Sequence, residues 1–151
     1  MEEKMGLFKF IKTAGEAIFK KGNKKEEDIK KHLKERMGGQ VDNVEVKEED
    51  GVVTLTGVCD SREVIEKVIL IAGNVEGVES VNGDELKLES GKAGDEAEFY
   101  TIVKGDSLWK IAKKYYGDGN KYPTLFEANR EVIKDADLIY PGQVIRIPAL
   151  K

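Results

Sequence analysis

The sequence predicts an α+β protein in which two small domains follow an amphipathic N-terminal helix. Three observations predict it: helical and alternating apolar patterns follow one another along the chain, a small, polar stretch separates two patterned regions, and 151 residues suffice for two small domains. We therefore expect an N-terminal helix over 1–22, a first domain over 23–90, a linker over 91–98 and a second domain over 99–151.

The N-terminal region has apolar residues near helical spacing, with Lys and Glu between them. Lys9 and Lys12 interrupt the unbroken apolar core that a secretory signal needs, so we expect a cytoplasmic protein. Docking onto the domains is the first interpretation of this helix, and a membrane-surface helix is the second, because lysines flank a Phe-rich face. The apolar positions are Leu7, Phe8, Phe10, Ile11, Ala14, Ile18 and Phe19.

The first domain begins with a predicted helix over 24–36, in which apolar residues recur every four positions and Gly38-Gly39 ends the pattern. Residues 44–46 and 53–55 alternate between apolar and polar. The Asp50-Gly51 turn between them predicts a hairpin.

Ser61 is a suitable N-cap for a second helix with a broad apolar stripe. Gly73-Asn74 ends that helix, because both residues tolerate left-handed backbone. Val78, Val81, Leu86 and Leu88 follow as a third strand. The predicted order is helix–strand–strand–helix–strand (αββαβ).

The second domain reads as strand–helix–helix–strand (βααβ). The strands are expected over 99–103 and 144–147, and Pro148 ends the last one. Asp106 or Ser107 caps the first helix.

Composition argues against several function classes. The chain has one His and one Cys, without a nucleophile elbow or a phosphate-binding glycine loop, so we expect no enzyme. We expect His32 to be solvated beside its lysines and Cys59 to be a half-buried structural side chain. Residues 23–90 carry ten basic and seventeen acidic side chains, which is unlike a nucleic-acid-binding face. No apolar run is long enough for an integral membrane protein, and we expect a monomer.

Two stretches resemble known modules. The run DGVVTLTG at 50–57, with VEGVESV at 75–81, resembles the BON domain, and residues 99–148 closely resemble the LysM domain. The whole arrangement from Met5 onward resembles the family of small bacterial cytoplasmic potassium-binding proteins. That resemblance implies selective binding of K⁺ over Na⁺ with a change of shape between the domains.

A potassium site needs backbone carbonyl oxygens, because their dipoles replace the ion's hydration shell, whereas carboxylate clusters favour divalent ions. Helix C-termini leave carbonyls unpaired at the negative end of the dipole. The helix ending at 72–73 runs into a glycine-containing loop, and the N-terminal segment could dock over it. Our hypothesis is a K⁺ cage of the main-chain oxygens of Ile11, Ala14, Gly73, Val75 and Val78.

The LysM resemblance implies an alternative, a cleft for N-acetylglucosamine-containing glycans such as peptidoglycan or chitin. In that family two loops line the cleft: backbone amides bind the acetyl oxygen and apolar walls hold its methyl group. The matching residues are Gly105, Asp106, Ser107, Leu108, Asp137, Leu138, Ile139 and Tyr140.

Overall fold

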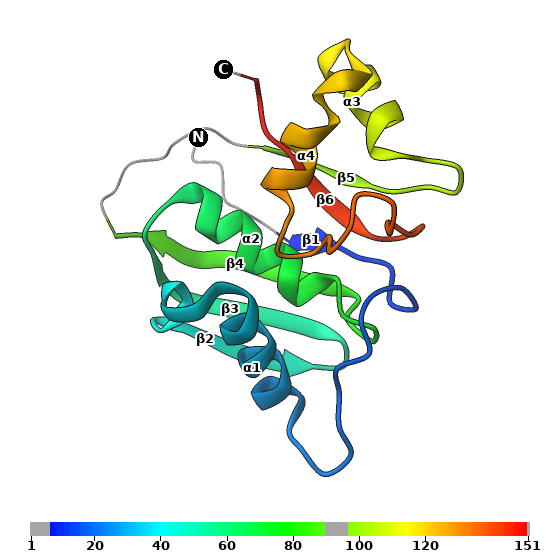
Figure 1. Cartoon of the computed structure of the whole chain (residues 1–151). Helices are drawn as coiled ribbons and strands as arrows, with labels where there is room; N and C mark the ends of the chain where they lie inside the picture. Colours follow the sequence, from blue (N-terminus) through cyan, green and yellow to red (C-terminus); the bar gives the residue numbers. More distant parts are fainter. Residues whose placement is uncertain (1–6, 90–96, 151) are drawn as a thin grey trace.

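A computed structural model describes residues 7–89 and 97–150 (Figure 1), which form a mixed α+β fold with a larger and a smaller unit. The larger unit is a four-stranded sheet in the order β1-β4-β3-β2. Two helices, α1 (Lys25–Met37) and α2 (Arg62–Gly73), pack on it. None of the helices among these residues is long and apolar enough to cross a membrane.

The predicted hairpin is confirmed. β2 (Val44–Glu49) and β3 (Val52–Cys59) pair antiparallel. The two residues between them, Asp50 and Gly51, both have positive φ, 50° and 85°, as a tight hairpin turn requires. β4 (Ser80–Leu88) then lies parallel to β3, with α2 as the connection between them.

The predicted helix ends are also confirmed. α1 stops at Gly38, and a short 3-10 turn over Gly38–Val41 follows. Ser61 caps α2 by accepting a hydrogen bond from the Val64 amide at 3.2 Å. Nine of the twelve residues of α2 are buried, because the sheet covers one side of the helix and the smaller unit contacts another.

The smaller unit follows the predicted strand–helix–helix–strand order. β5 (Glu98–Thr101) and β6 (Val144–Ile147) pair antiparallel. α3 (Leu108–Tyr116), a 3-10 turn over Gly119–Lys121 and α4 (Tyr122–Ala128) lie between them. A second apolar core, centred on fully buried side chains such as Ile111, Leu125 and Ile145, holds this unit together.

The N-terminal helix expected over 1–22 is wrong for residues 7–22, and residues 1–6 lie outside the described part. Leu7–Lys9 form β1, which pairs antiparallel with the edge of β4, and turns and extended chain follow. The helical spacing misled because tertiary contacts decide the conformation here: the edge of β4 pairs with this segment along its main chain, in place of the internal hydrogen bonds of a helix. Phe10 is then buried against Gly73.

The linker expected over 91–98 lies mostly outside the described residues. β5 begins at Glu98, the last residue of that range. Phe99 of β5 packs on Phe8 of β1, with ring centroids 4.8 Å apart, so the smaller unit rests on the N-terminal strand of the larger one.

Candidate cation site at the junction of three segments

Three segments distant in sequence meet beyond the end of α2: residues 10–16, the loop 73–79 and the loop 140–144. The first two are joined by main-chain hydrogen bonds. The Glu16 amide donates to the Asn74 oxygen at 3.0 Å, and the Glu76 amide donates to the Glu16 oxygen at 2.9 Å. The Gly77 amide also donates to the Lys12 oxygen at 2.7 Å. The N-terminal segment therefore lies on the loop as predicted, but it does so through turns and one bridge residue, Glu16, rather than as a helix.

Two glycines allow this close approach. Gly15 has φ +107°, and a Cβ there would lie 2.7 Å from the carbonyl carbon and oxygen of Asn74. Gly142 has φ +90°, and a Cβ there would lie 2.8 Å from the Cβ of Ala14 and 3.3 Å from that of Ile11. Both values of φ disfavour any side chain. The third segment thus reaches the two residues of the N-terminal segment that were predicted as ligands.

The five predicted carbonyls differ in their hydrogen bonding. The Ile11 oxygen accepts from the Ala14 amide at 3.0 Å, and the Val75 oxygen accepts from the Val78 amide at 3.0 Å. Within residues 7–89 and 97–150, the carbonyls of Ala14, Gly73 and Val78 accept none of the hydrogen bonds found. Three of the five thus keep both lone pairs, and the other two keep one each. Residues 7–89 and 97–150 also contain no group of three or more His, Cys, Asp or Glu side chains placed to hold a metal.

Beside this junction, Glu16 ties the N-terminal segment to α1. Nη2 of Arg36 lies 2.7 Å from both carboxylate oxygens of Glu16, and Nη1 of Arg36 donates to the Glu131 carbonyl oxygen at 2.6 Å. One guanidinium therefore joins α1, the N-terminal segment and the smaller unit.

His32 was expected to be solvated, and that expectation is wrong. It is buried, with its Nε2 3.9 Å from the Glu16 carboxylate. Burial, and then the positive charge of Arg36, lower the pKa of His32 below its usual value. The lysines beside it in sequence suggested exposure, but the docked N-terminal segment covers this face of α1. Cys59 is fully buried, and burial raises the pKa of its thiol to about 11.

A second set of contacts joins α2 to the smaller unit. Arg146 of β6 reaches Glu66 of α2, with Nη2 3.0 Å from the carboxylate, and both side chains are buried. The Ala97 amide donates to the other Glu66 oxygen at 2.9 Å. Burial raises the pKa of Glu66, and these two partners oppose that shift. Lys67 adds an ion pair with Glu131 at 3.0 Å.

Asn74 was predicted only as a helix terminator, through left-handed backbone. Its φ is −81°, so the backbone expectation is wrong, and its side chain has a different role. The amide nitrogen Nδ2 donates to the oxygens of Leu70 at 3.0 Å and Val144 at 2.7 Å. The oxygen Oδ1 accepts from the Val144 amide at 2.8 Å. No periodicity or motif in the sequence signals this contact between the two units.

Several residues of the predicted glycan cleft stabilise local structure. Asp106 accepts from the Tyr100 hydroxyl at 2.6 Å and the Val103 amide at 2.9 Å. Ser107 caps α3 and Leu108 is buried in the core. The oxygen of Gly105 accepts from Lys110 at 3.2 Å.

In the second predicted loop of the glycan cleft, residues 137–140, exposure to solvent decreases along the chain from Leu138. Leu138 is 66 % exposed, next to the exposed Asp137 and the half-buried Ile139. Tyr140 lies close to the junction, where burial and the negative charge of Glu16 raise its pKa to about 12. Leu138 is thus the most exposed apolar side chain among the eight predicted residues.

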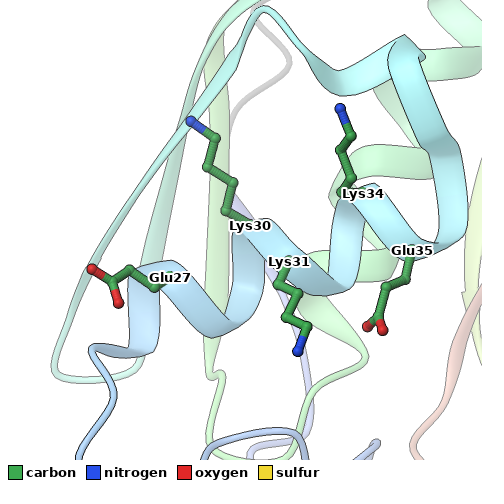
Figure 2. A pocket seen from close by; sticks show the side chains of 5 residues that line it. All are labelled: Glu27, Lys30, Lys31, Lys34 and Glu35. Atoms are coloured by element: carbon green, nitrogen blue, oxygen red, sulfur yellow. The ribbon is translucent and has the colours of Figure 1, made fainter.

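A depression beside α1 is a poor candidate site. Figure 2 shows that its lining side chains project from the outer face of this single helix. Lys30 pairs with Glu45 at 3.1 Å and Lys34 with Asp42 at 2.6 Å. The lining residues are Glu27, Lys30, Lys31, Lys34 and Glu35.

Comparison with known proteins adds to this geometry. Residues 24–90 match the BON domain and residues 100–148 match the LysM domain. Over 150 residues the chain is 39 % identical to the potassium binding protein Kbp of Escherichia coli O6:H1 (strain CFT073), covering 95 % of this chain and 99 % of that protein. The chain belongs to the family of this potassium binding protein.

Two other relatives share less of their length with this chain. An uncharacterised protein of Deinococcus radiodurans is 36 % identical over 75 % of this chain and 48 % of its own. The resuscitation-promoting factor Rpf of Micrococcus luteus is 40 % identical over 34 % of this chain and 23 % of its own. The Kbp relative therefore shares the full arrangement, and the Rpf match spans about a third of this chain.

Proposed function

We propose that this chain is a non-enzymatic, monomeric potassium-binding protein that acts as a K⁺ sensor or buffer in the cytoplasm. The proposal rests on one observation above the others: carbonyls that accept no hydrogen bond from the described residues lie in the two segments that glycine contacts bring together after α2. The name of the E. coli relative supports K⁺ as the ion.

The proposed ligands are the main-chain oxygens of Ile11, Ala14, Gly73, Val75 and Val78. Val75 and Val78 are fully buried, so an ion bound by their oxygens would leave most of its water shell, and carbonyl dipoles can replace that shell for K⁺. The Gly73 oxygen lies at the C-terminal end of α2, where the helix dipole favours a cation.

We further propose that ion binding favours the closed arrangement of the two domains. Ile11 and Ala14 touch Gly142 of the LysM domain, so fixing their carbonyls around an ion also fixes the surface on which that domain rests. The ion shifts the equilibrium only by its difference in affinity between the open and closed states.

The test is an NMR titration of the ion-stripped chain with KCl and, separately, NaCl at equal ionic strength. We expect the ¹³C carbonyl resonances of Ala14, Gly73 and Val78 to shift and saturate with KCl, because these oxygens would bind the ion directly. Saturable shifts in KCl that avoid the 10–16 and 73–79 segments would contradict the proposed ligands. Identical shifts in the two salts would contradict selectivity.

A second candidate function, binding of N-acetylglucosamine oligomers, is favoured by the LysM match and by the exposed Leu138. Titration with chitotetraose tests it. Saturable shifts at Gly105, Leu138 and Ile139 would support a glycan site, and unchanged spectra at millimolar sugar would contradict one.

A further inference from the structure

Two asparagines hold the same outer edge of β6. Oδ1 of Asn129 accepts from the Arg146 amide at 2.8 Å, and its Nδ2 donates to the Arg146 oxygen at 2.9 Å. Asn74 makes the same pair of bonds with Val144, at 2.8 and 2.7 Å. Val144 and Arg146 are two residues apart, so their main-chain groups face the same edge, opposite the one that β5 pairs.

The two asparagines share a second feature. Each follows a helix and donates to the carbonyl four residues earlier, Asn74 to Leu70 and Asn129 to Leu125. Both are buried, 6 % and 1 % exposed. Asn129, however, belongs to the LysM domain, whereas Asn74 belongs to the BON domain. The main-chain groups of Arg146 are therefore hydrogen-bonded within the LysM domain, whereas those of Val144 are hydrogen-bonded by Asn74 only when the BON domain docks.

Asn74 is also placed where the proposed ion would act. It lies between Gly73 and Val75, two of the proposed ligands, and its own carbonyl oxygen accepts from the Glu16 amide. A single residue thus contacts the N-terminal segment through its main chain and the LysM domain through its side chain. Binding of an ion by the carbonyls on either side would fix the backbone of Asn74 and so the direction of its amide.

We infer that Asn74 is the positioning residue that couples ion binding in the loop 73–79 to docking of the LysM domain. This inference rests on the proposed function. When the domains separate, the main-chain groups of Val144 lose their Asn74 partners. These groups then bond to water where the edge of β6 is exposed, and they stay unpaired at a cost in free energy where it is covered. The docked arrangement is favoured when the loop holds the Asn74 side-chain amide within hydrogen-bond distance of Val144. We therefore expect the loop and β6 to respond together to K⁺.

The test compares Asn74→Ala with Asn129→Ala by ¹H–¹⁵N spectra of the full chain during a KCl titration. The control removes the same kind of hydrogen bonds, from the same strand, within one domain. In the wild type and in Asn129→Ala, we expect the amides of residues 73–79 and of β6 to shift together. In Asn74→Ala the loop amides should still shift, with K⁺ affinity roughly 5- to 30-fold weaker, and the K⁺-dependent shift of Val144 should be lost.

Two outcomes separate the hypotheses. If the amides of residues 73–79 and of β6 shift together with K⁺ in the wild type and do so equally in Asn74→Ala, the inference is overturned and the proposed function stands. A wild-type chain with no K⁺-dependent shifts would overturn both. If Asn74→Ala does not fold, Asn74→Ser keeps a small polar side chain that cannot span both Val144 groups, and the same loss of the Val144 shift is expected.

Discussion

Replacing Gly15 with alanine should undock the N-terminal segment and weaken K⁺ binding. The new Cβ would lie 2.7 Å from the carbonyl carbon and oxygen of Asn74 and 2.9 Å from the carbonyl carbon of Val75. These are main-chain atoms, held by the hydrogen bonds of the loop 73–79, and they cannot turn aside as a flexible side chain would. Relief requires the segment to move away, and the carbonyls of Ile11 and Ala14 would move with it.

Gly22 provides a matched control for the size of the effect. It has φ +92°, close to the +107° of Gly15, but no atom lies within 4 Å of the Cβ that alanine would add. Both substitutions cost about 1–2 kcal/mol in backbone strain. Only Gly15→Ala adds overpacking, at about 1–3 kcal/mol, which corresponds to a roughly 5- to 150-fold loss of the docked population.

Isothermal titration with KCl and urea unfolding measure the two effects separately. We expect Gly22→Ala to lose stability with K⁺ affinity unchanged, and Gly15→Ala to lose both. Equal K⁺ affinities in the two variants would refute the reasoning, because the N-terminal carbonyls would then have no part in the site.

Two further predictions concern buried charges. Arg146→Met should destabilise the chain by about 3–5 kcal/mol, since it removes the closest cation from the buried Glu66 carboxylate and leaves it the Ala97 amide and Arg62 at 4.0 Å. Glu66→Leu combined with Arg146→Met should cost less than the single change; a double variant at least as unstable as Arg146→Met in urea unfolding would contradict this. The native pKa of His32 lies below its unfolded value of about 6.5, so the unfolded state binds more protons and stability should fall as pH drops through 6.5 toward the native pKa, then level off. Since His32 is the single histidine, NMR reads its titration directly, and a native pKa above 6.5 or an unchanged pH slope in His32→Gln would contradict the burial argument.

The sequence predicted those elements whose signals are local. The helix stop at Gly38, the Asp50-Gly51 turn and the Ser61 and Ser107 caps depend on neighbouring residues alone, and the structure has them where they were expected. The orders αββαβ and βααβ followed from these elements.

The N-terminal segment could not be predicted in this way. Leu7 and Phe10 are three positions apart, as in a helix, yet Leu7 pairs with Asn82 on the edge of β4 and Phe10 fills the space beside Gly73. Tertiary partners far along the chain decided the conformation. The burial of His32 had the same cause, because the segment that covers it was itself misassigned.

The candidate site was partly accessible from sequence. The glycine-containing loop after α2 and the docked N-terminal segment were expected, and both lie at the junction. Gly142 and the Asn74 side chain were not identified as contacts, because their partners are separated by about 70 residues or more in sequence. Contacts of that kind have no periodicity that a single sequence displays.

The most direct test of the central claim is a thermal melt of ion-stripped protein in KCl, NaCl and choline chloride at equal ionic strength. A ligand at ~100 times its Kd stabilises the folded state by ~2.7 kcal/mol, a shift of several degrees for a chain of this size. We predict that KCl raises Tm by that amount relative to the other two salts. Equal Tm values in all three salts would contradict a selective potassium site.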